Sequence, residues 1–272
     1  MYWGMGAYGR KKKLTAPELV VVDVNSRYGN TSSNWTRNSL TMQCWLKHLQ
    51  DIFNYREIDY IWFARNSSQF DIDDIKEVFG NTRRVVIGRS GCYAFNQMIL
   101  QNFFSVKKLS IAHSSFPNSK VPGRVLMLNF EDLDIGYRWV ERTILSLDEL
   151  LLINSKKIYI DNLQMSAKEL NKFIKLWQRG SNPRMEWLAI KHTIVKEDDK
   201  EAIIKGIKHE IFPSDYIRKF RAVEYHRIPR EIKGGIDIVR VDGMKATIRF
   251  KYRHSFPAIE MFVWFDHCVV DS

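Results

Sequence analysis

Cysteine is scarce in this sequence, and the few cysteines lie far apart. Cys44, Cys92 and Cys268 form no Cys-x-x-Cys pair anywhere in the 272 residues. An odd and sparse count of this kind argues against a disulfide framework and fits a reducing compartment.

Long apolar runs are also missing. None approaches the roughly 18 consecutive apolar residues that indicate a transmembrane helix. The basic cluster at 10–13 is followed by Leu14–Val22, but Pro17 and Glu18 interrupt that stretch, so it makes a poor signal-peptide core. We therefore predict an intracellular protein, in the cytoplasm or the nucleus, that does not enter a membrane.

Catalytic motifs are absent. No His-Glu-x-x-His, Gly-x-Ser-x-Gly or phosphate-binding Gly-x-x-x-x-Gly-Lys-Ser/Thr motif occurs. Residues 4–9 match the dinucleotide-binding Gly-x-Gly-x-x-Gly pattern, which needs a strand before it and a helix after it. Only three residues precede the match and the basic cluster at 10–13 follows it. We interpret the match as a coincidence and predict neither an enzyme nor a cofactor site.

Residues that could bind a metal occur only in isolated pairs. Cys44 and His48 share a face of a predicted helix, but two ligands do not complete a zinc site. The adjacent His267 and Cys268 are interpreted in the same way, as packing residues. The acidic cluster at 71–74 lacks the glycine and the distal glutamate of a calcium loop, and an acidic helix N-terminus explains it better. We predict no metal site.

Apolar and basic residues are abundant. Hydrophobic residues make up 45% of the chain and aromatic residues 13%, which predicts a folded protein. A net charge of +11 would attract acidic proteins, nucleic acid or anionic lipid. Within the basic stretch 218–233, Phe220, Tyr225 and His226 alternate with cations, as in proteins that bind single strands. A solvated charged face also produces such a stretch, so a nucleic-acid-binding protein remains an alternative.

Hydrophobic periodicity predicts alternating helices and strands before residue 146. The expected strands are 19–24, 58–64, 84–87, 106–111 and 126–130, and the expected helices are 39–55, 71–79 and 93–103, with a helical or turn segment at 135–145. Asp71 is a predicted N-cap and Gly80 a predicted C-cap. The strand beginning near Thr82 and the strand at Val106 are separated by a normal length for a leucine-rich repeat.

The stretch 147–192 is the most informative. A hydrophobe-x-x-Leu-x-hydrophobe spacing occurs in Leu147–Leu152 and again in Met185–Ile190, and it predicts two strands with a third at 157–162 between them. Ser166 and Glu169 form a predicted capping box at the start of a helix that ends near Gln178. Such a pattern is typical of stacked α/β repeats, which form surfaces that bind proteins.

Beyond residue 196 the pattern changes. We expect a helix at 197–211 and a β-meander at 236–265 with a turn at Asp242-Gly243. The predicted fold class is α/β, an irregular leucine-rich-repeat-like solenoid with a C-terminal β-rich cap. Its expected parts are a variable segment at 1–35, the repeat-like region at 36–195 and the helix with its β-meander cap at 196–272.

Several motifs resemble the F-box-associated type 2 domain, which is abundant in nematode proteins. The resemblance extends over about 36–265. It is most specific in five segments of the repeat-like region, namely 147–154, 158–162, 168–177, 180–184 and 186–188, and the domain itself is expected at about 130–192. It implies a leucine-rich-repeat-like fold. In such proteins an N-terminal F-box docks on a Skp-type adaptor of a cullin–RING ubiquitin ligase, and the associated domain captures the substrate.

The chain departs from this pattern at its N-terminus. Residues 1–35 contain no Leu-Pro and no amphipathic helix of F-box length, and Gly4, Gly6, Gly9 and Pro17 oppose a helix there. The substrate-binding part is therefore expected to be whole, whereas docking on a Skp-type adaptor and a cullin lacks its usual segment.

We predict a non-enzymatic protein-interaction domain whose partner is a protein substrate. Period-2 alternation places a set of strand side chains on one face, which we expect to face solvent and bind the partner. These candidate residues are Lys108, Ser110, Lys157, Tyr159, Asp161 and Glu186. Tyr159 is the preferred anchor because exposed aromatic side chains often dominate interfaces.

Overall fold

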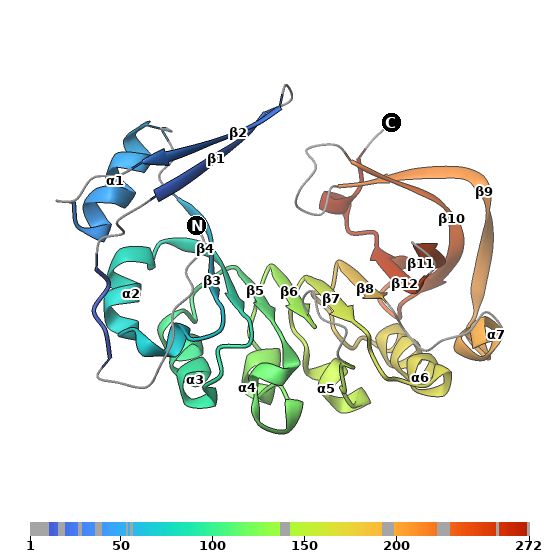
Figure 1. Cartoon of the computed structure of the whole chain (residues 1–272). Coiled ribbons are helices and arrows are strands. Elements are labelled where there is room, and N and C mark those ends of the chain that lie inside the picture. The colour runs from blue at the N-terminus through green and yellow to red at the C-terminus, as the bar shows by residue number, and fades with distance from the viewer. Residues whose placement is uncertain are drawn as a thin grey trace.

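Ten strands form one continuous sheet in the computed structural model of this chain (Figure 1). Their order is β3-β4-β5-β6-β7-β8-β12-β11-β10-β9. The structure describes residues 11–15, 20–26, 29–35, 40–52, 54, 57–136, 142–191, 199–221, 229–253 and 256–270. The match to the dinucleotide pattern at 4–9 and the side chains of Tyr225 and His226 lie outside these residues.

The first six strands of the sheet are parallel. They are β3 Ile58–Phe63, β4 Thr82–Ile87, β5 Lys108–Ile111, β6 Asp132–Ile135, β7 Lys157–Asp161 and β8 Trp187–Lys191. Arg84 pairs with Lys108, Lys108 with Asp132, Asp132 with Lys157 and Lys157 with Trp187. The sequence offset between paired residues is thus nearly constant from β4 to β7 and somewhat larger between β7 and β8. Each strand therefore begins a strand–helix unit of similar length.

Helices cover one face of these parallel strands, as Figure 1 shows. They are α2 Ile72–Phe79, α3 Tyr93–Asn102, α4 Gly123–Leu126, α5 Leu147–Leu152 and α6 Ala167–Gln178. Strand residues that point toward the helices, such as Ile87, Ile158 and Ile160, are fully buried in the main core. We call the opposite side of the sheet the helix-free face.

Helix α6 confirms the predicted capping box. The Ser166 hydroxyl accepts a hydrogen bond from the Glu169 amide, and the Glu169 carboxylate accepts one from the Ser166 amide. Phe173 and Trp177 of this helix are buried in the core. Asp71 likewise caps α2 as predicted, accepting from the amide of Asp73.

Two predicted strands are wrong. Leu147–Leu152 is helix α5, because Ser146 and Glu149 form a second capping box at its start. The apolar run in this segment fits a strand or a helix equally well, and the cap decides between them. The stretch predicted as a strand at 126–130 begins with the last residue of the short helix α4, and the strand is β6 instead. Of the segment expected to be helical or a turn at 135–145, residues 137–141 lie outside the described part, and Thr143 pairs with Leu163 in an isolated bridge.

The C-terminal strands extend the same sheet in antiparallel fashion. They are β9 His209–Phe220, β10 Arg230–Val239, β11 Lys245–Arg253 and β12 Phe256–Val263. Ile259 of β12 pairs with Ile190 of β8, which joins the predicted meander to the parallel strands. Helix α7 Asp199–Ile204 is shorter than the helix predicted at 197–211, because β9 begins at His209.

The N-terminal part adds a hairpin and a helix. The strand predicted at 19–24 is β1 Val20–Ser26, and it pairs with β2 Gly29–Trp35, which sequence periodicity missed. Helix α1 Met42–Ile52 follows within the predicted range, and Met42 and Trp45 are buried. Figure 1 shows the hairpin rising from the strand side of the sheet near β3 and β4, while β9 and β10 rise at the other end. The helix-free face lies between these two ends.

Candidate functional site on the helix-free face of the sheet

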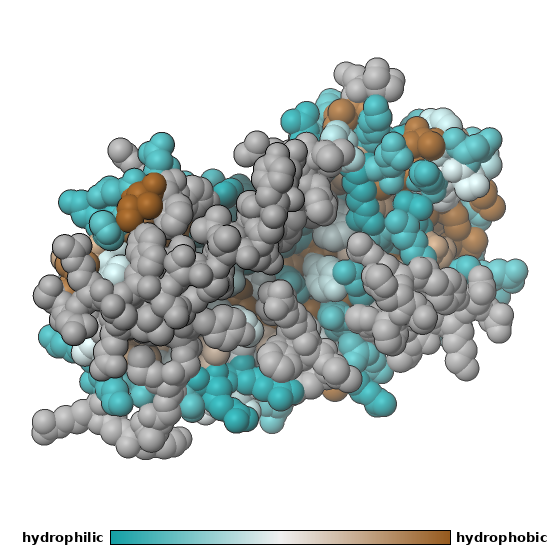
Figure 2. Space-filling view, turned by 45° about the horizontal axis from the view of Figure 1, so that its top comes forward, coloured by the Kyte–Doolittle hydropathy of each residue, from teal (hydrophilic) through white to brown (hydrophobic). Residues whose placement is uncertain are grey.

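Cross-strand pairing aligns polar side chains into rows on the helix-free face. The first row runs through Arg84, Lys108, Asp132, Lys157 and Trp187, one from each of β4 to β8. The second row runs through Val86, Ser110, Asp134, Tyr159 and Ala189. Neighbours within a row are close enough for their side chains to interact. Figure 2 turns this side toward the viewer, and the described residues visible there range from hydrophilic to hydrophobic.

The first row carries charges of both signs. The Arg84 Nη2 lies 3.4 Å from the Asp132 Oδ2, and both side chains are largely buried. Burial raises the pKa of Asp132, although Arg84 and Lys108 oppose that shift. Burial, followed by the charge of Arg83, lowers the pKa of Lys108. These charges are thus partly shielded from water, which strengthens their interactions with any group that approaches.

Asp134 is the most perturbed carboxyl group on this face. Burial, with the nearby carboxylates Asp132 and Asp161, raises its pKa to about 8. Its Oδ1 is buried and has no hydrogen-bond partner. At neutral pH this carboxyl is therefore mainly protonated and can donate a hydrogen bond to a ligand that reaches the second row.

Tyr159 lies beside Asp134 and beneath a cation. The Lys191 Nζ lies 4.4 Å from the centroid of the Tyr159 ring, within the range of a cation–π interaction. Lys191 also stands opposite Asp161 in the pairing of β7 with β8. Aromatic, acidic and basic groups therefore meet where these two strands end.

Burial separates the six predicted binding residues into two groups. Lys108, Lys157 and Tyr159 are half-buried on the helix-free face. Ser110, Asp161 and Glu186 are only 1%, 8% and 6% exposed, so the expectation that they face solvent is wrong. Alternation assigns a side chain to a face of a sheet, but it does not determine whether other parts of the protein cover that face. A role of these six residues in binding a partner stays a prediction.

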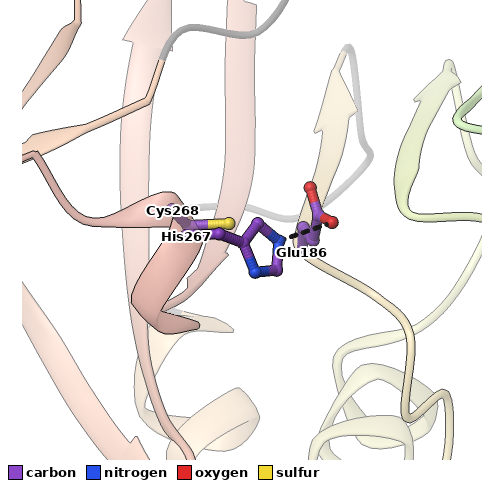
Figure 3. Close-up of side chains that lie close together, drawn as sticks. All are labelled: Glu186, His267 and Cys268. Carbon is purple, nitrogen blue, oxygen red and sulfur yellow. Dashed lines mark hydrogen bonds and ion pairs between the residues drawn. The ribbon is translucent and has the colours of Figure 1, made fainter.

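Glu186 lies in a separate cluster with His267 and Cys268, drawn in Figure 3. The His267 Nε2 lies 2.9 Å from the Glu186 Oε1, and the Lys156 Nζ lies 3.3 Å from the same oxygen. Burial and then Glu186 raise the pKa of the Cys268 thiol to about 11, so this thiol is protonated at neutral pH. The oxygen, nitrogen and sulfur atoms that could bind a metal lie within 4.8 Å of one another, but the ammonium of Lys156 already neutralises the carboxylate.

This cluster links the start of β8 to the residues after β12. Sequence reasoning treated His267 and Cys268 as packing residues and missed their contact with Glu186. No spacing rule connects Glu186 with them, because only the pairing of β12 with β8 brings the segments together.

Two cations of the predicted basic stretch, Arg218 and Arg230, are paired with carboxylates of other strands. Arg218 donates to both oxygens of Asp237, at 2.7 and 2.9 Å, and its guanidinium carbon lies 4.6 Å from the centroid of the Trp264 ring. Arg230 donates to both carboxylate oxygens of Glu260, at 2.5 and 2.8 Å. These two arginines therefore connect strands in the C-terminal part of the sheet.

Comparison with known proteins finds a family match in the central region. Residues 122–190 match the F-box associated family. The chain is 22% identical over 215 residues to the F-box associated domain-containing protein sdz-33 of Caenorhabditis elegans. That similarity covers 76% of this chain and 60% of the relative, so the chain spans less than two thirds of the relative's length. No solved structure matches the chain.

Residues 122–190 are therefore similar to the F-box associated family, as the resemblance of residues 147–190 predicted. The matched segment begins just before α4 and ends within β8. It includes the charged rows contributed by β6, β7 and most of β8. Among the described residues, no helix is long and apolar enough to cross a membrane.

Proposed function

We propose that this chain is a non-enzymatic protein-recognition domain that binds a protein partner on the helix-free face. The observation that carries the proposal is the pair of registered rows on β4 to β8, where charged and aromatic side chains lie on the side without helices. Partly desolvated charges such as those of Arg84, Asp132 and Lys108 favour the specific choice of one partner over others.

We further propose that the parallel part of the chain is a leucine-rich-repeat-like solenoid. The nearly constant sequence offset between paired strands from β4 to β7 supports this, as does a helix after each of these strands. In solenoids each unit contacts mainly its neighbours, and the accumulated curvature forms an extended concave surface suited to binding. The helix-free face would be that surface.

The match to the F-box associated family supports a substrate-recruiting role. We propose that the captured protein is a substrate presented to a cullin–RING ubiquitin ligase through a Skp-type adaptor. The described residues provide the surface for the substrate, and adaptor docking is the separate part of this proposal.

Affinity capture from a native lysate tests both parts. The tagged chain would be compared with a variant carrying Lys108→Glu and Lys157→Glu on the helix-free face. A matched control carries Lys168→Glu and Lys172→Glu, two exposed positions of α6 with the same change in charge. We expect the face variant to lose proteins that the wild type and the control both retain.

The outcomes separate recognition from ligase recruitment. Recovery of a Skp-type adaptor and a cullin with all three baits would support adaptor docking at a site outside the face. Their absence, beside a positive control with an intact F-box, would leave a recognition domain without ligase recruitment. Equal capture by the face variant and the wild type would overturn recognition through the helix-free face.

The alternative of nucleic-acid binding through 218–233 has less support. Arg218 and Arg230 are each held by a carboxylate, at Asp237 and Glu260, and so are not free to bind phosphates. Phosphate binding requires cations that are available to replace released counterions.

A further inference from the structure

The helix-free face continues from β8 onto β12 and β11, where positive charge gathers around one carboxylate. Ala189 of β8 pairs with Glu260 of β12, and Glu260 pairs with Arg249 of β11. Arg249 therefore extends the row that contains Asp134 and Tyr159. Ile248 and Met261, on the opposite side of these two strands, belong to the main core.

Glu260 is almost fully buried and already has two cationic partners. Arg230 binds both of its oxygens, and the Lys251 Nζ lies 3.4 Å from its Oε2. Burial alone would raise the pKa of Glu260, but Arg230 and Lys251 together lower it below its ordinary value. The carboxylate is therefore ionised and fully engaged.

Arg249 is a third cation near Glu260, and it makes no hydrogen bond or ion pair with that carboxylate. Within the described residues no hydrogen bond or ion pair joins its guanidinium to another group, and its Nη1 is buried without a partner. Burial lowers its pKa, and the charge of Arg230 adds to that effect against the opposing charge of Glu260. Three cations thus surround one carboxylate, and a buried donor that lacks an acceptor is costly.

The neighbouring side chains shape this spot as an extension of the recognition face. Lys251 pairs with Ala258, and Ala258 pairs with Lys191, the cation above Tyr159. Small alanines at 189 and 258 therefore separate the Tyr159 and Lys191 pair from the cationic group. The guanidinium of Arg230 also rests on the Phe262 ring, 5.0 Å from its centroid, which fixes its position.

We propose that Arg249, with Lys251 and Arg230 beside it, forms an anion subsite that receives an acidic or phosphorylated side chain of a bound peptide. This inference rests on the proposed recognition function and specifies the chemistry of the partner. A carboxylate or phosphoryl group offers two oxygens in the geometry that a guanidinium binds with two parallel hydrogen bonds. Such a group would pair with the half-buried guanidinium of Arg249 and offset the excess positive charge.

Fluorescence polarisation with the purified full chain tests the subsite directly. Three fluorescein-labelled peptides share one Gly/Ala/Ser framework and carry a central serine, glutamate or phosphoserine. We expect the glutamate and phosphoserine peptides to bind at least about tenfold more tightly than the serine peptide, because a charged partner strengthens each hydrogen bond. Inorganic phosphate should compete with both. Whichever anionic peptide binds more tightly shows whether the subsite prefers a carboxylate or a phosphoryl group.

Two arginine variants determine whether Arg249 carries this preference. Arg249→Gln should weaken binding of the anionic peptides by about tenfold or more and leave the serine peptide unchanged. Arg179→Gln removes the same charge from an exposed position at the end of α6 and should keep the preference. Arg249→Lys retains the charge but lacks the planar guanidinium, so it should bind the anionic peptides with intermediate affinity. It replaces the glutamine variant in this test if that variant does not fold. Equal binding of all three peptides, or an unchanged preference in Arg249→Gln, would overturn the subsite.

The subsite and the proposed function can fail separately. If Arg249→Gln captures the same proteins from lysate as the wild type while Lys108→Glu with Lys157→Glu loses them, the recognition face stands and the anion subsite falls. If anionic peptides need Arg249 but lysate capture is unaffected by the charge reversals at Lys108 and Lys157, the subsite stands and recognition through the first row falls.

Discussion

The imidazole of His267 contacts the carboxylate of Glu186 across 81 residues of sequence, with 2.9 Å between Nε2 and Oε1. This contact fastens the residues after β12 to the start of β8. Lys156, the residue just before β7, pairs with the same carboxylate and so connects a third strand to this contact. The carboxylate thus holds together the place where the parallel part of the sheet meets the antiparallel part.

Replacing Glu186 with Gln should weaken this junction. We expect the free energy of unfolding at pH 7 to fall by about 1–3 kcal/mol, because Lys156 loses its ion pair and the buried acceptor loses its charge. His267 and Lys156 lower the pKa of Glu186 against the effect of burial. The stabilisation is therefore present above the ordinary value of 4.5 and is lost as pH falls through the lower folded-state value. Urea unfolding of both proteins at pH 7 and near pH 4 measures the difference, and a gap that widens toward pH 4 would contradict this account.

Replacing Asp134 with Asn should have the opposite effect on stability. The folded-state pKa of about 8 lies above the ordinary value of 3.8, so the folded protein holds a proton that the unfolded chain releases. Stability then falls as pH rises between these two values. Asn does not ionise, so the variant does not lose stability in this way as pH rises. We expect its free energy of unfolding to exceed that of the wild type by about 1–3 kcal/mol at pH 7.5, with a smaller gain near pH 5. Chemical unfolding at both pH values is the measurement, and a destabilised variant at pH 7.5 would show that Asp134 is ionised and paired.

The sequence revealed local structure better than it revealed long-range pairing. Ser166 and Glu169 predicted the start of α6 because a capping box requires only residues three apart. The same signal is present at Ser146 and Glu149 before α5, but the leucine spacing of 147–152 also fits a strand. A strand predicted there makes the strand spacing look irregular, whereas the sequence offset between paired strands is nearly constant from β4 to β7.

The candidate site was predictable only in part, for a related reason. Alternation placed Lys108, Lys157 and Tyr159 on the correct face of their strands, since that property is local. Arg249 and Glu260 escaped notice because the relevant rows continue across β8, β12 and β11, and neither the direction nor the register of that pairing can be read from sequence. Burial of Ser110 and Asp161 likewise depends on what covers the strands.

The capping box at Ser146 offers a direct test of the structure where the sequence prediction failed. Ser146→Ala should lower the free energy of unfolding by about 1 kcal/mol, because the Glu149 amide loses its acceptor. Ser166→Ala, which removes the equivalent cap of α6, is the matched comparison and should cost a similar amount. Thermal unfolding followed by circular dichroism measures both. No effect at Ser146 together with a loss at Ser166 would favour a strand at 147–152.

Arg218 distinguishes a structural role of the basic stretch from a role in binding nucleic acid. Its guanidinium joins Asp237, Thr247 and the ring of Trp264, so Arg218→Ala should lower the free energy of unfolding by about 2–4 kcal/mol through an unpaired Asp237. Lys219→Ala, at the next and exposed position of β9, should be nearly neutral. Urea unfolding compares the two variants with the wild type.

The same region can be tested for nucleic-acid binding without disturbing that network. Lys219→Glu and Lys233→Glu reverse two exposed charges of 218–233 and leave Arg218 and Arg230 in place. Because Arg218 and Arg230 are already paired, we expect a labelled single-stranded oligonucleotide to bind weakly to the wild type even at low salt, and the double variant to change this little. Tight binding that falls steeply with added salt and disappears in the variant would instead show that the basic stretch contacts phosphates.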